Sequence, residues 1–334
     1  MARTRDPRRG VVVIVGASSG IGRATALRFA RHRGSLVLAA RSRESLEEVA
    51  EECRSRGADV LVQPTDVSDE TQVQALVDAA VERFGRIDVW IGVASVFSYG
   101  SFEDTPSEVF RQQLETNLMG QVHSARAVLP VFRSLGGSSG RKPSPRHPIG
   151  RIVFLASIYS RVTSPYASGY ITAKHGLLGF SDTLREEVRR DGIEVSAVLP
   201  ATIDTPIYQQ SANYTGQRVH PLPPITSPTR VAAAIERITV HPKRAVKVGR
   251  SQGLLVPFRD LAPGVYSRAV RPAMDAMALR GGDVEPSPGN VFAPQPELNA
   301  ISGGWRRPRF TRFLPIAAAG AALLLLRRAR SSAR

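Results

Sequence analysis

Cysteine and lysine are scarce in this chain of 334 residues. Cys53 is the only cysteine, so an internal disulfide and a metal site made of several thiolates are both excluded. The histidines show no metal-ligand spacing, and we predict no metal site. A single free cysteine fits a reducing compartment, so we expect a cytoplasmic protein.

Long hydrophobic runs are also missing. The apolar stretch near the N-terminus, Val11–Val15, is shorter than the roughly 7 to 15 residues of a signal-peptide core. Residues 313–326 form an uncharged, mostly apolar run flanked by arginine. As a helix this run spans about 21 Å, short of the roughly 30 Å hydrocarbon core of a bilayer. Three alternatives stay open for it: a packed or interfacial helix, a short membrane anchor, or a disordered tail.

Positive charge is in excess, but it is concentrated at the two ends of the chain. The formal net charge is +16, of which residues 1–10 supply +3 and residues 298–334 supply +8. The remaining +5 is spread over the other 287 residues, so we predict no specific nucleic-acid binding. A basic, apolar C-terminal tail instead suits an anionic membrane surface.

The rest of the composition is that of an ordinary globular protein. Hydrophobic residues make up 42% and charged residues 22% of the chain, which excludes disordered, collagen-like and coiled-coil classes. From residue 11 to about 250, short β-branched runs alternate with longer helical patterns. This alternation predicts a doubly wound α/β fold, a parallel sheet of about seven strands covered by helices on both faces.

The expected elements are named here by their residues. The predicted strands are Val11–Val15, Leu36–Ala40, Val60–Gln63, Ile87–Val93, Arg151–Ala156, Ile193–Leu199 and Ala245–Val248. The predicted helices lie near Ile21–His32, Arg43–Arg56, Asp69–Phe84, Ser107–Arg133, Tyr170–Arg190 and Pro228–Val240. Beyond residue 251 the periodicity weakens, so we expect an irregular C-terminal extension.

A glycine-rich segment follows the first predicted strand and opens the first predicted helix. Gly16 permits the tight turn, Gly20 lets the backbone approach a diphosphate, and Gly22 lets the helix lie close to the strand. Free N–H groups at the helix start favour a negatively charged ligand. The placement predicts a dinucleotide site that includes Gly16, Ser18, Ser19, Gly20, Ile21 and Gly22.

Arg41 directly follows the second predicted strand. A carboxylate at this point accepts a hydrogen bond from the 2′-hydroxyl of NAD, whereas a guanidinium binds the 2′-phosphate of NADP. Arg41 therefore predicts NADP (NADPH) in preference to NAD, the alternative being a solvated arginine at a helix start. Asp66 and Val67, after the third strand, are expected beside the adenine. The alternative is a structural role: Ser68 is expected to cap the next helix, and a nearby acid such as Asp66 suits the N-terminus of that helix.

Four motifs in this order resemble the short-chain dehydrogenase/reductase family. The glycine segment is similar to that family's TGxxxGIG fingerprint, and Tyr170 and Lys174 match its YxxxK. Ser157 stands 13 residues before Tyr170, as in that family, and Asn117 matches its helix asparagine. The resemblance covers about residues 9–250.

The resemblance implies a Rossmann-type fold, a catalytic tetrad of Asn117, Ser157, Tyr170 and Lys174, and hydride transfer with a nicotinamide. It adds further cofactor-binding residues: Ala94, Tyr170, Lys174, Pro200, Ile203 and Thr205. The domain organisation that we expect is a basic N-terminal tail at 1–10, a Rossmann catalytic domain at 11–250, the extension at 251–305 and a basic, apolar tail at 306–334.

The four residue types fit carbonyl reduction. Tyr170 is the expected proton donor, and Lys174, one helical turn further on, is expected to lower the pKa of that phenol from its ordinary value of about 10. Ser157 would hydrogen-bond and polarise the substrate oxygen. The resemblance implies that Asn117 extends a proton relay from Lys174 through its backbone carbonyl and a water.

Two segments depart from the family pattern. Residues 92–95 read Gly-Val-Ala-Ser where the family has NNAG, and Ala201 stands where PGxxxTP has glycine. The lost asparagines motivate a second hypothesis, a dinucleotide-binding sensor or interaction protein with little turnover. The basic ends of the chain motivate a third, a membrane-peripheral interaction protein.

Apolar residues gather after two predicted strands: Val96, Phe97 and Tyr99 after the fourth, and Ile207, Tyr208, Tyr214 and Leu222 after the sixth. They predict an apolar pocket with few charges. The sequence therefore predicts an NADP-dependent oxidoreductase that interconverts a ketone or aldehyde with an alcohol. We expect a small-molecule substrate that is apolar and bulky or lipidic rather than acidic, a homo-oligomer, and membrane contact through residues 313–326.

Overall fold

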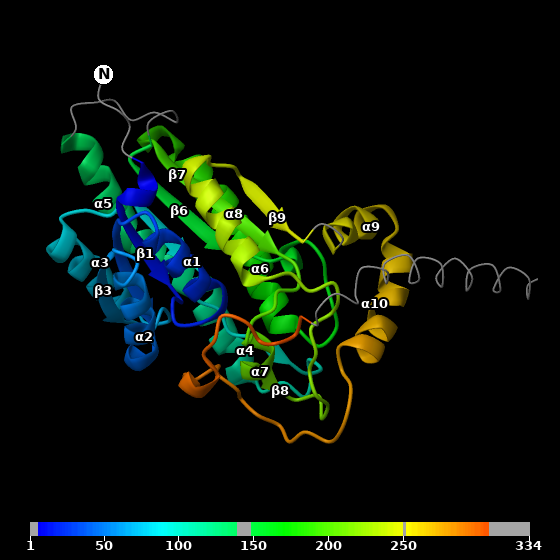
Figure 1. Cartoon of the computed structure of the whole chain (residues 1–334). Helices are drawn as coiled ribbons and strands as arrows, with labels where there is room; N and C mark the ends of the chain where they lie inside the picture. Colours follow the sequence, from blue (N-terminus) through cyan, green and yellow to red (C-terminus); the bar gives the residue numbers. More distant parts are fainter. Residues whose placement is uncertain (1–5, 139–147, 250–251, 307–334) are drawn as a thin grey trace, which may run out of the picture.

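Among the residues that the structure describes, seven parallel strands form one sheet in the order β3-β2-β1-β4-β6-β7-β9 (Figure 1). The computed structural model describes residues 6–138, 148–249 and 252–306. The strands are β1 (Val11–Val15), β2 (Ser35–Ala40), β3 (Asp59–Pro64), β4 (Val89–Gly92), β6 (Gly150–Leu155), β7 (Ile193–Pro200) and β9 (Ala245–Val248). The prediction of a doubly wound α/β fold is confirmed.

The centre of the sheet sets the position of the site. All five side chains of β1 are buried, since β2 and β4 flank it and helices cover both faces. Val12 pairs with Leu36 of β2 and with Val89 of β4. After β3 the chain crosses back over β1 to form β4, so the direction of strand addition reverses there. Ligands of open parallel sheets bind at the carboxyl ends of the strands at such a reversal.

Helices form a layer on each face of the sheet (Figure 1). One layer contains α1 (Gly20–Ala30), α2 (Arg43–Arg54) and α8 (Pro228–Val240), and the other contains α3 (Glu70–Phe84), α5 (Gly120–Ser138) and α6 (Ser168–Val188). Phe29 and Leu46 are fully buried under the first layer, and Leu76 and Phe132 under the second. Each such side chain contributes about 1.5–3 kcal/mol, so the strand ends are held firmly in place.

The long helix expected over Ser107–Arg133 is interrupted. α4 (Ser107–Leu114) is followed by a π-helical turn, η2 (Glu115–Met119), before α5 begins. Asn117 lies in this turn, and its side-chain amide bonds the backbone after β4, as described below. π-turns are rare and occur often at functional sites. Hydrophobic spacing does not reveal the turn, because α4 and α5 both pack an apolar face against the rest of the protein and together give a continuous helical pattern.

The C-terminal extension, expected to be irregular, contains two helices. These are α9 (Leu255–Leu261) and α10 (Pro263–Met277), after which the chain returns toward the carboxyl edge of the sheet (Figure 1). Tyr266 and Met274 are buried at helical spacing along α10. Pro272 inside α10 hides this helix in the sequence, because proline usually ends a helical pattern.

Smaller elements complete the described chain. β5 (Ser98–Tyr99) pairs in parallel with β8 (Ala212–Asn213) in a second sheet, which joins the loops after β4 and β7, and α7 spans Ile207–Gln210. Five 3-10 helices are η1 (Pro7–Arg9), η3 (Ile158–Ser160), η4 (Arg189–Asp191), η5 (Gln252–Leu254) and η6 (Pro296–Leu298).

Residues 313–326, for which a membrane contact is predicted, lie outside the described residues. Within the described ranges, no helix combines the length and apolar character needed to cross a bilayer. The proposed domain boundaries stay a prediction.

Candidate active site

The turn between β1 and α1 depends on glycine at three positions. Gly16 has φ of +88°, and a Cβ there would lie 2.5 Å from the Ala94 amide nitrogen. A Cβ on Gly22 would lie 1.8 Å from the Gly16 carbonyl oxygen. Gly20 has φ of +51° and faces the Thr205 side chain. The residues therefore fit a dinucleotide: the glycines leave room for a close approach, and the first-turn amides of α1 have no intrahelical acceptors.

A cavity of about 910 Å³ opens at the carboxyl ends of the central strands. The structure brings all the predicted cofactor residues to its wall: Gly16, Ser18, Ser19, Gly20, Ile21, Gly22, Arg41, Asp66, Val67, Ala94, Tyr170, Lys174, Pro200, Ile203 and Thr205. Ser157 lines the same cavity. Residues far apart in sequence thus converge because parallel strands end at the same edge of the sheet.

Arg41 is held at the cavity wall rather than freely solvated. Its Nη2 donates to the Asn290 carbonyl at 2.6 Å, and its Nη1 donates to the Val291 carbonyl at 3.3 Å. Burial lowers the pKa of Arg41, but an arginine remains protonated in proteins. The guanidinium keeps further N–H groups with which to bind an anion.

Asp66 combines a place on the cavity wall with a local structural role. Its Oδ1 accepts from the Ser68 backbone N–H at 3.0 Å and from the Ser68 hydroxyl at 2.7 Å. The expectation that Ser68 caps the next helix is wrong, because Asp69 is the N-cap of α3 and accepts from the amides of Thr71 and Gln72. The carboxylate of Asp69 reaches both amides, whereas Ser68 is turned toward Asp66.

Asn117 lies behind the cavity and braces its wall. Its Oδ1 accepts from the Val96 N–H, and its Nδ2 donates to the Val96 carbonyl, both at 2.8 Å. The side chain is fully buried. Gly92, in the segment that departs from the family pattern, leaves room for Gln121, since a Cβ there would lie 1.9 Å from Gln121 Oε1. The altered segment is therefore tightly packed.

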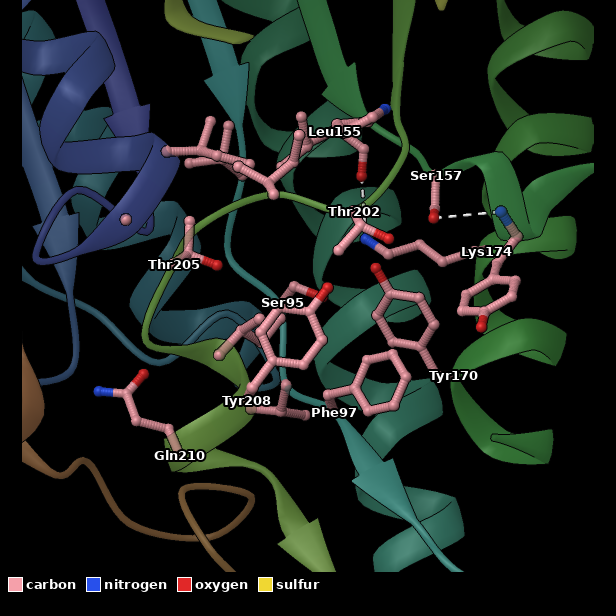
Figure 2. A pocket seen from close by; sticks show the side chains of 18 of the residues that line it. Ser95, Phe97, Leu155, Ser157, Tyr170, Lys174, Thr202, Thr205, Tyr208 and Gln210 are labelled. Atoms are coloured by element: carbon pink, nitrogen blue, oxygen red, sulfur yellow. Dashed lines mark hydrogen bonds between the residues drawn. The ribbon is translucent and has the colours of Figure 1, made fainter. Parts of the chain in front are cut away.

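Ser157, Tyr170 and Lys174 lie together at the end of β6 and the start of α6 (Figure 2). Ser157 caps η3, where its Oγ accepts from the Tyr159 N–H at 3.1 Å. Lys174 Nζ donates to the Leu155 carbonyl at 2.9 Å and lies 5.4 Å from the centre of the Tyr170 ring. The Phe97 ring packs against Tyr170 with 4.2 Å between centroids and fixes the orientation of the phenol.

The expected lowering of the Tyr170 pKa is not found. Burial raises the pKa of Tyr170 to about 12, an effect that the hydroxyls of Ser157 and Ser95 reduce. Burial also lowers the pKa of Lys174 to about 7. Desolvation is the largest cause of both shifts because both groups are buried, and the ammonium donates to the Leu155 carbonyl rather than to the phenol.

The other end of the cavity is apolar, as predicted. Val96, Phe97, Tyr99, Ile207, Tyr208 and Leu222 line it, but Tyr214 does not. Tyr214, which follows β8, instead borders a separate small pocket. Sequence reasoning missed the outer wall, formed from α9 and α10 by Leu255, Phe258, Tyr266, Val270, Ala273, Met274 and Met277. Apolar residues at 266, 270, 274 and 277 have helical spacing and were the available signal.

Comparisons with known proteins agree with this geometry. Residues 10–215 match the sequence family described as short chain dehydrogenase. The Bos taurus protein named dehydrogenase/reductase SDR family member 7B is 31% identical over 272 residues, 78% of this chain and 80% of that protein.

Two solved structures are similar to the chain. An alcohol dehydrogenase from the archaeon Thermococcus sibiricus, complexed with 5-hydroxy-NADP, aligns with a TM-score of 0.59 at 27% identity over 72% of this chain and 94% of its own. A variant of actinorhodin polyketide ketoreductase with NADPH aligns with a TM-score of 0.62 at 26% identity over 74% of this chain and 98% of its own.

The chain belongs to the short-chain dehydrogenase/reductase family. It is an NAD(P)-dependent oxidoreductase with a Rossmann-type sheet. The family match ends at residue 215, before α8, β9 and the whole C-terminal extension. The outer wall of the cavity is thus contributed by a part of the chain that the match does not include.

Proposed function

We propose that this enzyme is an NADP-dependent reductase of apolar ketones or aldehydes that also runs in reverse on the alcohols. One observation carries the proposal: the hydroxyls of Ser157 and Tyr170 lie where the dinucleotide part of the cavity meets its apolar part. A carbonyl group at this junction would have the two hydroxyl donors beside it, and a nicotinamide cofactor held by the glycine segment would supply the hydride.

Each proposed catalytic residue has a distinct task. When bound, NADPH would supply the hydride. Tyr170, whose raised pKa keeps it a neutral phenol, donates a proton to the carbonyl oxygen as negative charge develops there. Ser157 donates a hydrogen bond to the same oxygen. Lys174, when protonated, offsets the negative charge left on Tyr170. Asn117 is a positioning residue that holds the segment after β4 through Val96, and the proton relay through its backbone carbonyl stays a prediction.

The preference for an apolar substrate rests on the charges of the cavity wall. Among the described residues that line it, the charged side chains are Arg41, Asp66 and Lys174. Arg41 follows β2 and Asp66 follows β3, so both lie at the dinucleotide end of the cavity. The ammonium of Lys174 is already bonded to the Leu155 carbonyl. A substrate carboxylate would lose its hydration at the apolar end without gaining a partner.

The preference for NADP rests on Arg41 at the end of β2. Its guanidinium offers N–H donors where a 2′-phosphate would lie and no acceptor for a 2′-hydroxyl. Both similar structures described above contain an NADP-type cofactor.

Steady-state turnover tests the proposal. A bicyclic or long-chain ketone is compared with the same skeleton carrying a carboxylate, with NADPH and with NADH. We expect kcat/KM to be at least about 100-fold higher for the uncharged ketone, since an unpaired buried charge costs several kcal/mol. NADPH oxidation that no ketone accelerates, despite cofactor binding, would favour the sensor hypothesis instead.

Assembly and localisation complete the proposal. We expect a cytoplasmic homo-oligomer whose residues 306–334 associate with anionic membrane surfaces, because the eight arginines from residue 298 onward accompany an apolar run. Light scattering measures the assembly, and flotation with anionic vesicles compares the full chain with one that ends at residue 305. Equal flotation of the two chains would show that residues 306–334 do not bind the membrane.

A further inference from the structure

Residues 290–305, close to the end of the described chain, cross the dinucleotide end of the cavity. We call this segment the C-terminal strap. It follows α10 and the return of the chain toward the sheet edge, shown in orange to red in Figure 1. Asn290, Pro294, Gln295 and Asn299 of the strap line the cavity. The strap lies beyond the family match that ends at residue 215.

The first end of the strap is fixed in the protein core. Val291 is fully buried and packs with Val96, Val109 and Ala212. The carbonyls of Asn290 and Val291 accept the two hydrogen bonds from Arg41 described above. The guanidinium expected to bind a 2′-phosphate therefore holds two carbonyl oxygens of the strap.

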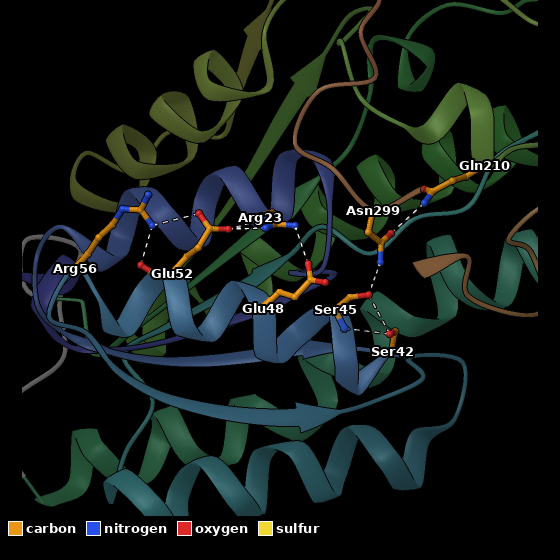
Figure 3. A network of polar contacts seen from close by, with 8 residues as sticks. All are labelled: Arg23, Ser42, Ser45, Glu48, Glu52, Arg56, Gln210 and Asn299. Atoms are coloured by element: carbon orange, nitrogen blue, oxygen red, sulfur yellow. Dashed lines mark hydrogen bonds and ion pairs between the residues drawn. The ribbon is translucent and has the colours of Figure 1, made fainter. Parts of the chain in front are cut away.

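The middle of the strap contacts the start of α2 and the start of α1. Asn299 Nδ2 donates to Ser45 Oγ at 2.7 Å, and Asn299 Oδ1 accepts from Gln210 Nε2 at 3.1 Å (Figure 3). The next carbonyl, that of Ala300, accepts from the Gly20 N–H at 2.8 Å. A carbonyl oxygen of the strap thus takes the hydrogen bond of a backbone N–H in the first turn of α1.

The far end of the strap is held by Asp204, in the loop after β7. Asp204 Oδ2 accepts from the Ser302 hydroxyl and Oδ1 accepts from the Trp305 N–H, both at 2.8 Å. The Trp305 indole N–H donates to the Thr205 carbonyl at 3.3 Å and to Gln209 Oε1 at 3.1 Å. The strap therefore spans from the end of β2 to the loop after β7.

Carbonyl oxygens of the strap lie at two anion-binding groups of the dinucleotide site. A backbone N–H has one hydrogen, so the Gly20 amide does not serve the Ala300 carbonyl and a phosphate oxygen together. A carbonyl also places partial negative charge at the start of α1, where a diphosphate is favoured. Arg41 donates to two further strap carbonyls, those of Asn290 and Val291, and keeps other N–H groups for a 2′-phosphate.

We infer that the C-terminal strap is an autoinhibitory segment that competes with the phosphates of the cofactor and lifts from Gly20 to admit it. This inference rests on the proposed function only for the identity of the ligand, NADP(H). If the closed strap excludes the cofactor, the apparent affinity is reduced by the fraction of molecules with the strap open.

Cofactor-binding kinetics test the strap directly. The double variant Asn299→Ala/Ser302→Ala removes side chains that hold the strap but leaves Arg41, Gly20 and the tetrad intact. We expect the association rate constant for NADPH, followed by its fluorescence, to rise about tenfold, with an unchanged dissociation rate constant. Ala293→Ser, at an exposed strap position, is the matched control and should behave as the wild type.

Hydrogen exchange in the wild-type protein gives an independent measurement. Competition predicts that NADP⁺ increases deuterium uptake in the peptide containing residues 298–306, because the Gly303 and Trp305 amides lose their bonds to Asp204. Increased protection of that peptide would overturn the inference, since it would make the strap a clamp on bound cofactor. An unchanged association rate in the double variant would overturn it as well.

The same experiments separate this inference from the proposed function. NADPH binding without ketone turnover refutes the proposed function but still allows the strap to be tested by the binding rates. Binding by the double variant and not by the wild type supports the inference. If neither protein binds NADP(H), both proposals fail.

Discussion

The two ends of the cavity are built in different ways. At the dinucleotide end, backbone atoms of Gly16, Gly20 and Gly22 define the shape, and a carbon added to Gly16 or Gly22 would collide with the backbone. At the apolar end, the wall consists of long, flexible side chains from α9 and α10, such as Phe258 and Met277. A wall made of backbone has little freedom to change shape, whereas flexible side chains such as that of Met277 can repack.

The largest effect is expected where the two ends meet. Tyr170→Phe keeps the ring that packs on Phe97 but removes the proton donor, so turnover should fall by about 10² or more. Cofactor binding, measured by NADPH fluorescence, should persist. Tyr214→Phe is the control, because Tyr214 lies outside the main cavity. Near-normal turnover of Tyr170→Phe would remove this residue from its proposed role.

A second large effect is expected at the dinucleotide end. Arg41→Asp replaces a phosphate partner by a group that repels phosphate and accepts from a ribose hydroxyl. The ratio of kcat/KM for NADPH to that for NADH should fall by about 10² or more. The substitution also removes the bonds from Arg41 to the Asn290 and Val291 carbonyls. Any effect of this loss on the strap should change the binding of NADPH and NADH alike, so it cancels in the ratio. A wild-type enzyme that prefers NADH would contradict the assignment without any variant.

The backbone wall itself is tested by a pair of glycine substitutions. Gly22→Ala places a carbon against the Gly16 carbonyl, so α1 must shift, and we expect a loss of about 1–3 kcal/mol in the free energy of unfolding together with weaker NADPH binding. Gly179→Ala, on α6 with nothing within 4 Å of the added carbon, should stabilise the protein by up to about 1 kcal/mol. Urea unfolding measures the free energy of unfolding of both variants. Equal changes in the two would show that the backbone around Gly22 is no more tightly packed than the surface of α6.

Lys174 links stability to pH. Its pKa is about 7 in the folded protein against an ordinary value of 10.5, so between these values the unfolded chain binds more protons and stability rises with pH. The rise should be about 1 kcal/mol per pH unit for this single group. The variant Lys174→Met lacks this titrating group, so this contribution to the pH dependence of stability should disappear. A difference in unfolding free energy between wild type and variant that is constant over this range would contradict the lowered pKa.

The smallest effect is expected at the adaptable end. Met277→Ala, at the cavity rim, should raise KM for a bulky ketone by only about two- to fivefold, since neighbouring side chains fill part of the space. The affinity for NADPH should not change. Val265→Ala, exposed on α10 away from the cavity, is the control. A loss of cofactor affinity in Met277→Ala would show that the two ends are not independent.

Much of the fold was predictable because local patterns decide it. Buried β-branched strands, the glycine turn and the Tyr170–Lys174 spacing each depend on residues close together in sequence. The altered segment at residues 92–95 shows the limit of such patterns. Its packing depends on Gln121, from another element, so the sequence showed only that the family asparagines were missing.

The sequence by itself determined the class of fold and the residues expected at the dinucleotide end of the cavity, because the alternation of β-branched runs with helical patterns and the glycine spacing constrain the backbone. Only the tertiary structure decided the rest. Burial set the pKa directions of Tyr170 and Lys174, since desolvation depends on every neighbour. The strap met Arg41 and Gly20 through backbone carbonyls of Asn290, Val291 and Ala300, and carbonyls carry no side-chain signature in a sequence.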